Sequence, residues 1–374
     1  MRTLIALTIL LIVAAAAGPA TRARPEEPAD GPLSPAWEIP LPDTSAPFLA
    51  GTADGFLVGT PSGRLRAHRA DGSGPLWEVD LEARILSAPV LAPDRLAITL
   101  EGGAVAILRS GDGGPVARAE APSAAPSEAA AHLVSVPAGF VISRGPTVTL
   151  LDPSTGTALW STELPAPASA AAAQCGTHLL VGTQRGDLVS IDPADGAVRW
   201  SRPLAEGSIT TAAGCWHDRA FVGAADNRLY AVKLQRRKPD RKWSFLTGGD
   251  IAGRPLVHGG RLLVLSYDTY LYALEADNGH LAWRVRLGRR PRPDGVLYGD
   301  RLVVAPLNTE ILEIFALPGG GQGPPPSLLQ DKERFVSPPV LAGDLIVIAA
   351  ARYGEDTARL IAVDPGGIGS LLHP

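Results

Sequence analysis

The stretch LLVGTQRGDLVSIDPADGAVRW, residues 179–200, holds the pattern from which the fold can be predicted. It contains a short apolar run, a turn with a glycine, a second run of alternating residues, an Asp-Pro turn and a tryptophan. Alternating residues bounded by tight turns are typical of short antiparallel β-strands joined as hairpins. The tryptophan then begins a third strand.

The same order of features recurs along the chain of 374 residues. The apolar runs begin near residues 56, 96, 140, 179, 220, 262, 302 and 345, which makes eight units of 39 to 44 residues. The periodic tryptophans are Trp37, Trp77, Trp160, Trp200, Trp243 and Trp283. Their spacings are 40, 83, 40, 43 and 40 residues, and Ala117 stands where the 83-residue interval lacks a tryptophan. Only Trp216 is off this period.

Each unit contains about four short antiparallel strands, because a more variable strand precedes each apolar run, as in RPLVHG at 254–259. Repeats of ~40–45 residues with four strands and a tryptophan signature are typical of propeller blades. A single blade can bury its two faces only against two neighbours. We therefore predict an all-β, eight-bladed β-propeller of four-stranded antiparallel blades over residues 36–374.

The two ends of this region predict how the ring closes. Residues 37–41 form a Trp-type strand without the strands that normally precede it, and residues 360–367 end a unit that lacks its Trp-type strand. We expect the first strand to complete the last blade. The eighth Trp-type strand is degenerate and is expected near residues 323–330, and a seven-bladed ring is the alternative if that region is irregular.

The residues before the propeller predict export. Arg2 precedes the apolar run Leu4–Ala17, which is shorter than the ~20 residues that a membrane helix needs. We expect residues 1–23 to be a cleaved signal peptide and residues 24–35 to be an extended, Pro-rich leader. The mature chain would then be periplasmic or secreted, with no transmembrane span. An uncleaved anchor is the alternative.

Composition excludes several classes of protein. The net charge of −4 argues against a strongly basic nucleic-acid binder. Two cysteines exclude a disulfide-rich scaffold, and 41 glycines with 35 prolines fit many turns and few long helices. The sequence has no HExxH motif, no Ser–His–Asp order and no motif with paired carboxylates. We therefore name no catalytic, cofactor-binding or metal-binding residue.

The repeat resembles the pyrroloquinoline-quinone (PQQ)-type propeller family. A small residue, an Asp/Glu turn with glycine and a tryptophan follow one another with matching spacing in Ala67–Trp77, Ser190–Trp200 and Ala273–Trp283. The resemblance covers roughly residues 36–369. It implies that the six periodic tryptophans dock each blade against its neighbour, and that small residues such as Ala67 let the blades approach closely.

Two branches of this family imply different functions. The quinoprotein alcohol dehydrogenases use PQQ and Ca²⁺ and carry an adjacent Cys-Cys pair, which this sequence lacks. The B component of the bacterial outer-membrane β-barrel assembly machinery is a non-catalytic, eight-bladed scaffold, similar to this chain in length and layout. Because the first cysteine is Cys175, we expect no lipid anchor after the signal peptide.

The resemblance favours an exported, monomeric, non-catalytic propeller that binds a protein partner in the cell envelope, without a cofactor. Outer-membrane protein assembly is the role that the second branch implies. The alternative is a PQQ-dependent dehydrogenase with Ca²⁺, or a small-molecule sensor, that uses the central channel.

The two cysteines, Cys175 and Cys215, occupy nearly equivalent places in adjacent units. An inter-blade disulfide needs Cα atoms within about 7 Å, whereas packed sheets lie ~10 Å apart, so the two strands would have to converge near the ring axis. A zinc site with His178, His217 or His258 is a second alternative. The third is a pair of buried small side chains beside exposed turn histidines.

Two basic runs are candidate contacts for an anionic partner such as phospholipid or acidic glycan. Strand order predicts that they lie on opposite faces of the ring, so we favour a solvated rim. The residues are Arg236, Arg237, Lys238, Arg241 and Lys242 in the first run, and Arg284, Arg286, Arg289, Arg290 and Arg292 in the second.

Overall fold

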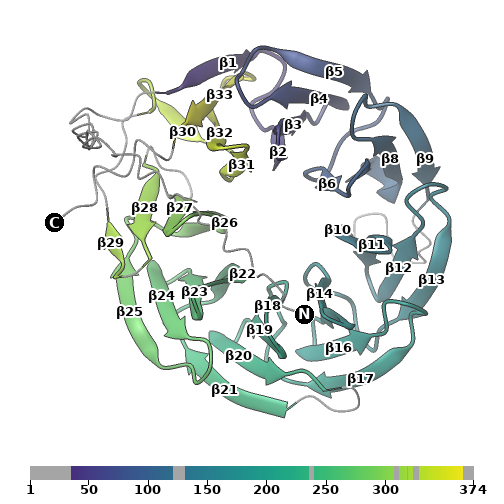
Figure 1. Ribbon diagram of the computed structural model, residues 1–374, viewed down its shortest axis with the longest axis vertical. Helices are drawn as coiled ribbons and strands as arrows, with labels where there is room; N and C mark the ends of the chain where they lie inside the picture. Colours follow the sequence, from purple (N-terminus) through teal and green to yellow (C-terminus); the bar gives the residue numbers. More distant parts are fainter. Residues whose placement is uncertain are drawn as a thin grey trace, which may run out of the picture.

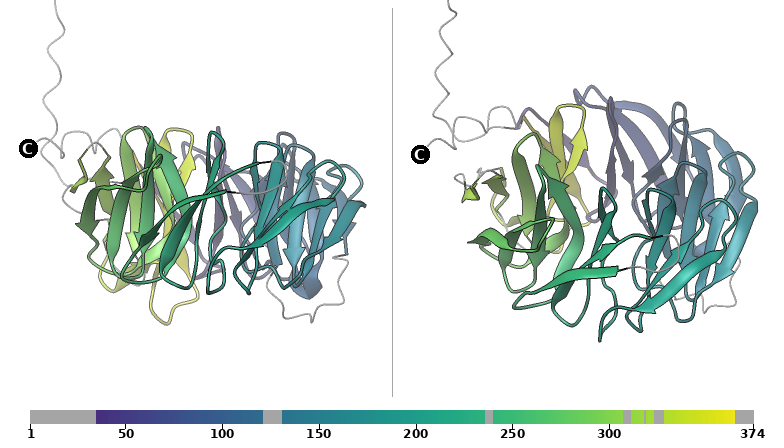
Figure 2. Two further views of the ribbon diagram at one scale, coloured as in Figure 1. Left: turned by 90° about the horizontal axis from the view of Figure 1, so that it is seen from below. Right: turned by 60° about the horizontal axis from the view of Figure 1, so that its bottom comes forward.

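The computed structural model describes residues 35–120, 131–235, 240–306, 311–317, 319–322 and 328–364. These residues form eight antiparallel sheets arranged radially in a closed ring (Figure 1). Seen edge-on, the ring is a disc whose strands run between its two faces (Figure 2). The eight-bladed propeller is therefore confirmed, and a seven-bladed ring is excluded. The expected signal peptide, nearly all of the leader and residues 365–374 lie outside the described residues.

Each blade has an inner strand beside the ring axis and a second strand next to it. The inner strands are β2 (Phe48–Gly51), β6 (Val90–Leu91), β10 (Ala131–Val136), β14 (Ala173–Cys175), β18 (Gly214–Trp216), β22 (Ile251–His258), β26 (Pro291–Tyr298) and, as two pieces, β30 (Glu333–Phe335) with β31 (Val340–Ala342). The second strands are β3 (Gly55–Gly59), β7 (Arg95–Thr99), β11 (Gly139–Arg144), β15 (His178–Gly182), β19 (Arg219–Gly223), β23 (Arg261–Ser266), β27 (Arg301–Pro306) and β32 (Leu345–Arg352).

Two further strands complete each blade toward the rim. The third strands are β4 (Arg64–Arg69), β8 (Val105–Arg109), β12 (Thr147–Leu151), β16 (Asp187–Ile191), β20 (Arg228–Lys233), β24 (Tyr270–Glu275), β28 (Glu313–Ala316) and β33 (Ala358–Val363). The outer strands are β5 (Pro75–Asp80), β9 (Pro115–Ala119), β13 (Ala158–Glu163), β17 (Val198–Pro203), β21 (Asp240–Leu246), β25 (Leu281–Arg286), β29 (Gly321–Gln322) and β1 (Trp37–Leu41). We number the blades 1 to 8 from β2–β5 to the blade made of β30–β33 and β1.

Burial explains why the repeat reads as it does. The second and third strands are covered on both faces, so β3 and β16 are buried throughout. This burial explains continuous apolar runs such as that of β3. The outer strands have one face toward solvent, and β5 alternates between exposed and half-buried residues. The apolar clusters lie between neighbouring blades, as where Phe221 and Leu229 of blade 5 meet Leu262 of blade 6.

The first strand closes the ring. β1 pairs antiparallel with β33, with Trp37 opposite Ala362, as predicted. In blade 7 the outer strand begins at β29, Gly321–Gln322, directly after Gly320, whose φ is +73°. Gln322 pairs with Phe315 as Leu281 pairs with Leu274 in blade 6, so the position equivalent to Trp283 is residue 324, inside the expected stretch 323–330. Residues 323–327 lie outside the described residues. Within the described part of the chain, no helix is long and apolar enough to cross a membrane.

Each periodic tryptophan lies on an outer strand and faces the next blade. The indole Nε1 of four of them donates a hydrogen bond to a backbone carbonyl in the turn between that blade's third and outer strands. The distances are 2.8–3.2 Å for Trp37–Ala70, Trp77–Ser110, Trp160–Pro193 and Trp200–Gln235. Among the described residues, the same nitrogen of Trp243 and Trp283 has no such partner. Ala117 occupies the equivalent register position in blade 2, opposite Ile107.

The same turns present a glycine to the tryptophan. Five of these glycines face a tryptophan with φ between 68° and 76°, namely Gly72, Gly113, Gly196, Gly279 and Gly320. The equivalent Gly156, with φ of 69°, faces Ala117, which replaces the tryptophan in blade 2. A Cβ on Gly196 would lie 2.7 Å from the ring of Trp160, and one on Gly279 would lie 2.5 Å from the ring of Trp243. Two constraints therefore require glycine here. The backbone is in the left-handed region, and the indole fills the space that a side chain would occupy.

The docking of tryptophan on glycine predicts a difference between two Gly→Ala substitutions. Gly196 and Gly176 both have positive φ, 76° and 59°, so alanine costs about 1–2 kcal/mol at each from its backbone conformation. Only at Gly196 would the new methyl group meet an indole, since nothing lies within 4 Å of a Cβ at Gly176. We expect Gly196→Ala to lower the free energy of unfolding by roughly 1–3 kcal/mol more than Gly176→Ala, measured by urea denaturation. Equal losses would contradict the docking contact.

Candidate functional site

The inner strands of adjacent blades converge at the ring axis. A Cβ on Gly214 would lie 2.3 Å from the carbonyl oxygen of Pro255, and one on Gly253 would lie 1.4 Å from that of Pro293. Glycine is therefore needed where β18, β22 and β26 approach one another. This convergence brings side chains of neighbouring blades within bonding distance, which the ~10 Å spacing of ordinary packed sheets does not.

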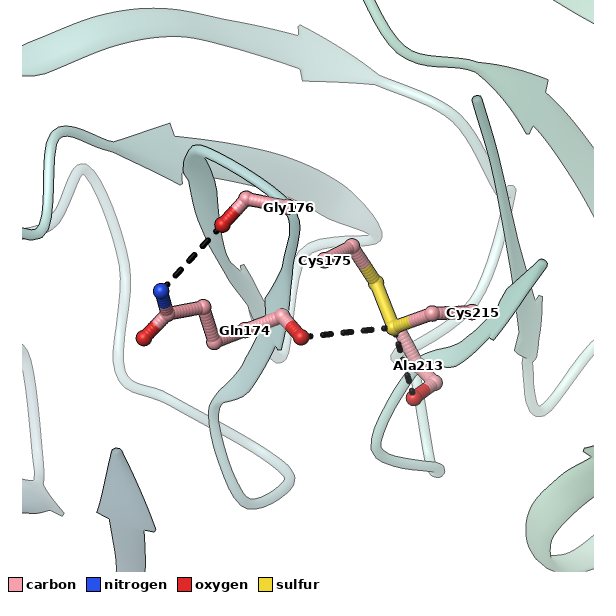
Figure 3. Close-up of a disulfide and its surroundings, with 5 residues drawn as sticks. All are labelled: Gln174, Cys175, Gly176, Ala213 and Cys215. Atoms are coloured by element: carbon pink, nitrogen blue, oxygen red, sulfur yellow. Dashed lines mark hydrogen bonds between the residues drawn. A yellow bond between two sulfur atoms is a disulfide. The ribbon is translucent and has the colours of Figure 1, made fainter. Parts of the chain in front are cut away.

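Cys175 and Cys215 form a disulfide between the inner strands of blades 4 and 5 (Figure 3). Their Cα atoms are 5.5 Å apart, within the range that a disulfide requires. Cys175 is buried, whereas Cys215 is exposed. The bond thus links β14 to β18, which belong to different sheets.

The histidines of the zinc alternative do not join the cysteines. His178 is buried and its Nδ1 lies 2.8 Å from the Ser190 hydroxyl. His217 lies in the β18–β19 turn with its ring beside Trp216, and His258 lies 2.8 Å from Asp300. Because both sulfurs are in the disulfide, they are not available as thiolate ligands, and the zinc alternative is wrong for these two cysteines.

The channel wall between blades 3 and 7 is hollowed into two adjoining cavities. One has a volume of about 840 Å³ and is lined largely by small residues and by the disulfide, with Ala171–Gln174 and Ala212–Cys215 along its wall. The other, of about 480 Å³, is lined by polar groups that include His132, Asp250 and Tyr267. Volumes of this size are typical of small-molecule sites.

A quinone cofactor that depends on Ca²⁺ would need side chains that can hold the metal ion. Within the residues that the structure describes, no group of three or more His, Cys, Asp or Glu side chains is placed to hold a metal ion.

A groove of about 670 Å³ runs between blades 1 and 2 on the face that carries the inner-to-second strand turns. His68 lies in the wall of this groove and is 4% exposed. Its ring stacks on that of Phe56 with an angle of 4° between the planes, and Phe56 stacks in turn on Trp37 with an angle of 17°. Neither ring nitrogen of His68 has a hydrogen-bond partner within the described part of the chain. A buried polar group without a partner is costly, so His68 is a candidate contact for a ligand in this groove.

Burial sets the charge state of three histidines. Desolvation lowers the pKa of His68, and the Arg66 guanidinium lowers it further while Glu78 opposes the shift. Desolvation likewise lowers the pKa of His132 and of His178. These rings are therefore kept neutral at neutral pH.

The structure describes only part of the candidate basic residues. Arg236, Arg237 and Lys238 lie outside the described residues. Of the second run, the Arg284 guanidinium carbon lies 5.0 Å from the centre of the Tyr270 ring. Arg286, Arg289 and Arg290 are exposed.

Sequence reasoning missed His68, although a signal was present. In the other blades the equivalent position of the third strand, directly after the partner of the periodic residue, holds an apolar side chain, as at Leu108, Ile191 and Val232. A column-by-column comparison of the repeats would have marked the histidine as a departure. Nothing in the repeat pattern marks the cavities, because they are lined by small residues from several blades.

Comparisons with known proteins agree with this architecture. A family model described as outer membrane protein assembly factor BamB matches residues 144–367, more than half of the chain. BamB from Moraxella catarrhalis superposes with a TM-score of 0.69 at 15% identity, over 88% of this chain and 97% of that chain. The computationally designed protein Ika8 superposes with a TM-score of 0.70 at 12% identity, over 88% and 99%. No curated protein matches the chain in sequence.

The disulfide predicts a loss of stability on reduction. It closes a loop with a sequence separation of 40 residues, for which the expected contribution is about 2–4 kcal/mol. Urea denaturation with and without a thiol reductant should show this loss in the wild-type chain. In a variant with Cys175→Ala and Cys215→Ala, the reductant should have no effect, and an unchanged wild-type midpoint would contradict the prediction.

The buried histidines predict a loss of stability in mild acid. Because the folded-state pKa of His68, His132 and His178 is lowered, the unfolded chain binds more protons than the folded chain as pH falls through about 6.5. Their contribution is complete above that pH and is lost below it, by up to about 1.4 kcal/mol per pH unit for each ring.

Substitution of one histidine tests this assignment. We expect His68→Leu to raise the free energy of unfolding at neutral pH, since leucine is the residue at the equivalent Leu108, and to reduce the slope between about pH 7 and about pH 5. His280→Gln removes an exposed ring and is the control, with an unchanged slope. An identical slope in wild type and His68→Leu would show that His68 does not contribute.

Proposed function

The chain belongs to the PQQ-like propeller family whose model is described as outer membrane protein assembly factor BamB, and from this membership we propose that it is an exported, non-catalytic scaffold. In this proposal its faces bind protein partners in the bacterial cell envelope. Its role there is in the assembly of outer-membrane proteins. The observation that carries the proposal is the family match over residues 144–367.

The regular architecture of the ring supports a scaffold function. The described residues between β2 and β33 are almost entirely blade strands and the short turns that join them. Propellers host unrelated activities, so the function must come from sites added to the fold. Within the described residues no group of three or more His, Cys, Asp or Glu side chains is placed to hold a metal ion, and the turns between strands lie on the two faces of the disc (Figure 2).

The disulfide supports export. Disulfides persist in oxidising compartments such as the bacterial periplasm and are rare in the cytosol. Both cysteines of the sequence are joined in the Cys175–Cys215 bond. The apolar run Leu4–Ala17 after Arg2 is what a secretory signal peptide requires. Together they favour a periplasmic or secreted protein.

The alternative is a function in the channel, as a quinone-dependent dehydrogenase or a small-molecule sensor. The observation in its favour is the pair of cavities of about 840 and 480 Å³ in the channel wall. Titration of the purified protein with PQQ and Ca²⁺, followed by tryptophan fluorescence and a dye-reduction assay, separates the two proposals. Saturable binding with alcohol-dependent dye reduction would overturn the scaffold proposal.

The envelope role is tested by deleting the gene from its host and measuring folded β-barrel proteins in the outer membrane by their heat-modifiable migration. We expect their amount to fall, and to be restored by the full chain but not by residues 36–374 expressed without the leader. Unchanged barrel proteins after the deletion would contradict a role in their assembly. Equal rescue by the leaderless chain would contradict export.

A further inference from the structure

A small polar pocket lies on the face of the ring that carries the second-to-third strand turns, where blades 7 and 8 meet the loop that leads into blade 1. Its volume is about 260 Å³. Three arginines line it, Arg292 from β26, Arg334 from β30 and Arg352 from β32, together with Ser45 and Glu355. Three cations and a single anion converge on one small volume.

Arg292 is held by one hydrogen bond and keeps further N–H donors for a ligand. It is half-buried, and its guanidinium donates a hydrogen bond of 3.0 Å to the carbonyl of Phe335. Its Nε is buried and has no hydrogen-bond partner among the residues that the structure describes. Desolvation and the neighbouring Arg334 both lower the pKa of Arg292, which means that the two like charges face each other in a poorly hydrated place. That arrangement is unfavourable unless an anion joins them.

The nearby acids do not supply that anion. Glu333 is already in an ion pair with Arg359 at 2.6 Å, and Glu355 lies 3.8 Å from Arg352 with both side chains about half exposed. The guanidinium carbon of Arg334 lies 4.9 Å from the centre of the Tyr353 ring. Among the described residues, neither Arg292 nor Arg334 has an ion-pair partner.

The positive charge extends beyond the pocket. Arg289 and Arg290 directly precede β26 and are exposed on the same face. A single small ion would use only the pocket, whereas an extended segment with several carboxylates would also meet these two arginines. The charge distribution therefore fits an acidic peptide better than an isolated ion.

We propose that this pocket is an oxyanion site, in which Arg292 and Arg334, with Arg352 at the rim, bind a carboxylate from an acidic segment of a protein partner. Guanidinium groups match carboxylates through paired, charge-assisted hydrogen bonds. The proposal deepens the scaffold function and rests on it, because it names the chemistry of one contact surface.

The test uses the purified protein and a fluorescent acidic peptide of alternating Glu and Gly, with the matching Gln and Gly peptide as its neutral counterpart. Fluorescence anisotropy should show saturable binding of the acidic peptide alone, weakened by added salt. Arg292→Gln with Arg334→Gln should weaken it by roughly tenfold or more. Arg202→Gln, which removes an exposed arginine of blade 4, should leave it unchanged.

If Arg292→Gln does not fold, Arg334→Gln alone carries the test, because the only contact described for that side chain is with the exposed ring of Tyr353. No binding of the acidic peptide, equal binding of the neutral peptide, or equal binding by the double variant would overturn the proposal. Binding of inorganic phosphate without binding of the peptide would also overturn it. None of these results would alter the gene-deletion outcome, so failure of this site is distinguishable from failure of the scaffold function.

Discussion

The contact between an outer-strand tryptophan and the left-handed glycine of the next blade is the interaction on which the ring depends. Each blade is a small sheet with two apolar faces, and it cannot bury both alone. The indole fills the space that a side chain on the glycine would need, as Trp160 does against Gly196. Because the tryptophan of one blade is covered by the next, each blade is stable only beside its neighbours.

Closure follows from the same constraint. An open row of blades would leave one apolar face uncovered at each end, so the chain begins with the strand that the last blade lacks. β1 joins β33 in register, and Trp37 then docks on Gly72 of blade 1. The last blade boundary is thus built like the others, although its strands come from opposite ends of the chain.

Radial packing also makes the rim and the axis chemically different. At the rim the blades spread apart and bulky tryptophans fill the space between them. At the axis the inner strands come so close that glycine is required, as at Gly253, and two cysteines on adjacent blades can bond. The candidate sites include residues that depart from the repeat, as His68 does at a position that is apolar in the other blades.

The sequence by itself predicted the strand order, the way the ring closes and eight blades, because the burial of each blade imposes the same residues at the same period. The degenerate eighth Trp-type strand left seven blades open, and the structure decided for eight. The sequence also placed Cys175 and Cys215 at equivalent positions, but left their bond open, since sequence spacing does not report how closely two inner strands approach. Only the tertiary structure joined them at a Cα distance of 5.5 Å. It alone brought Arg292 and Arg334 into one pocket, because that pocket forms between blades from side chains that no repeat relates.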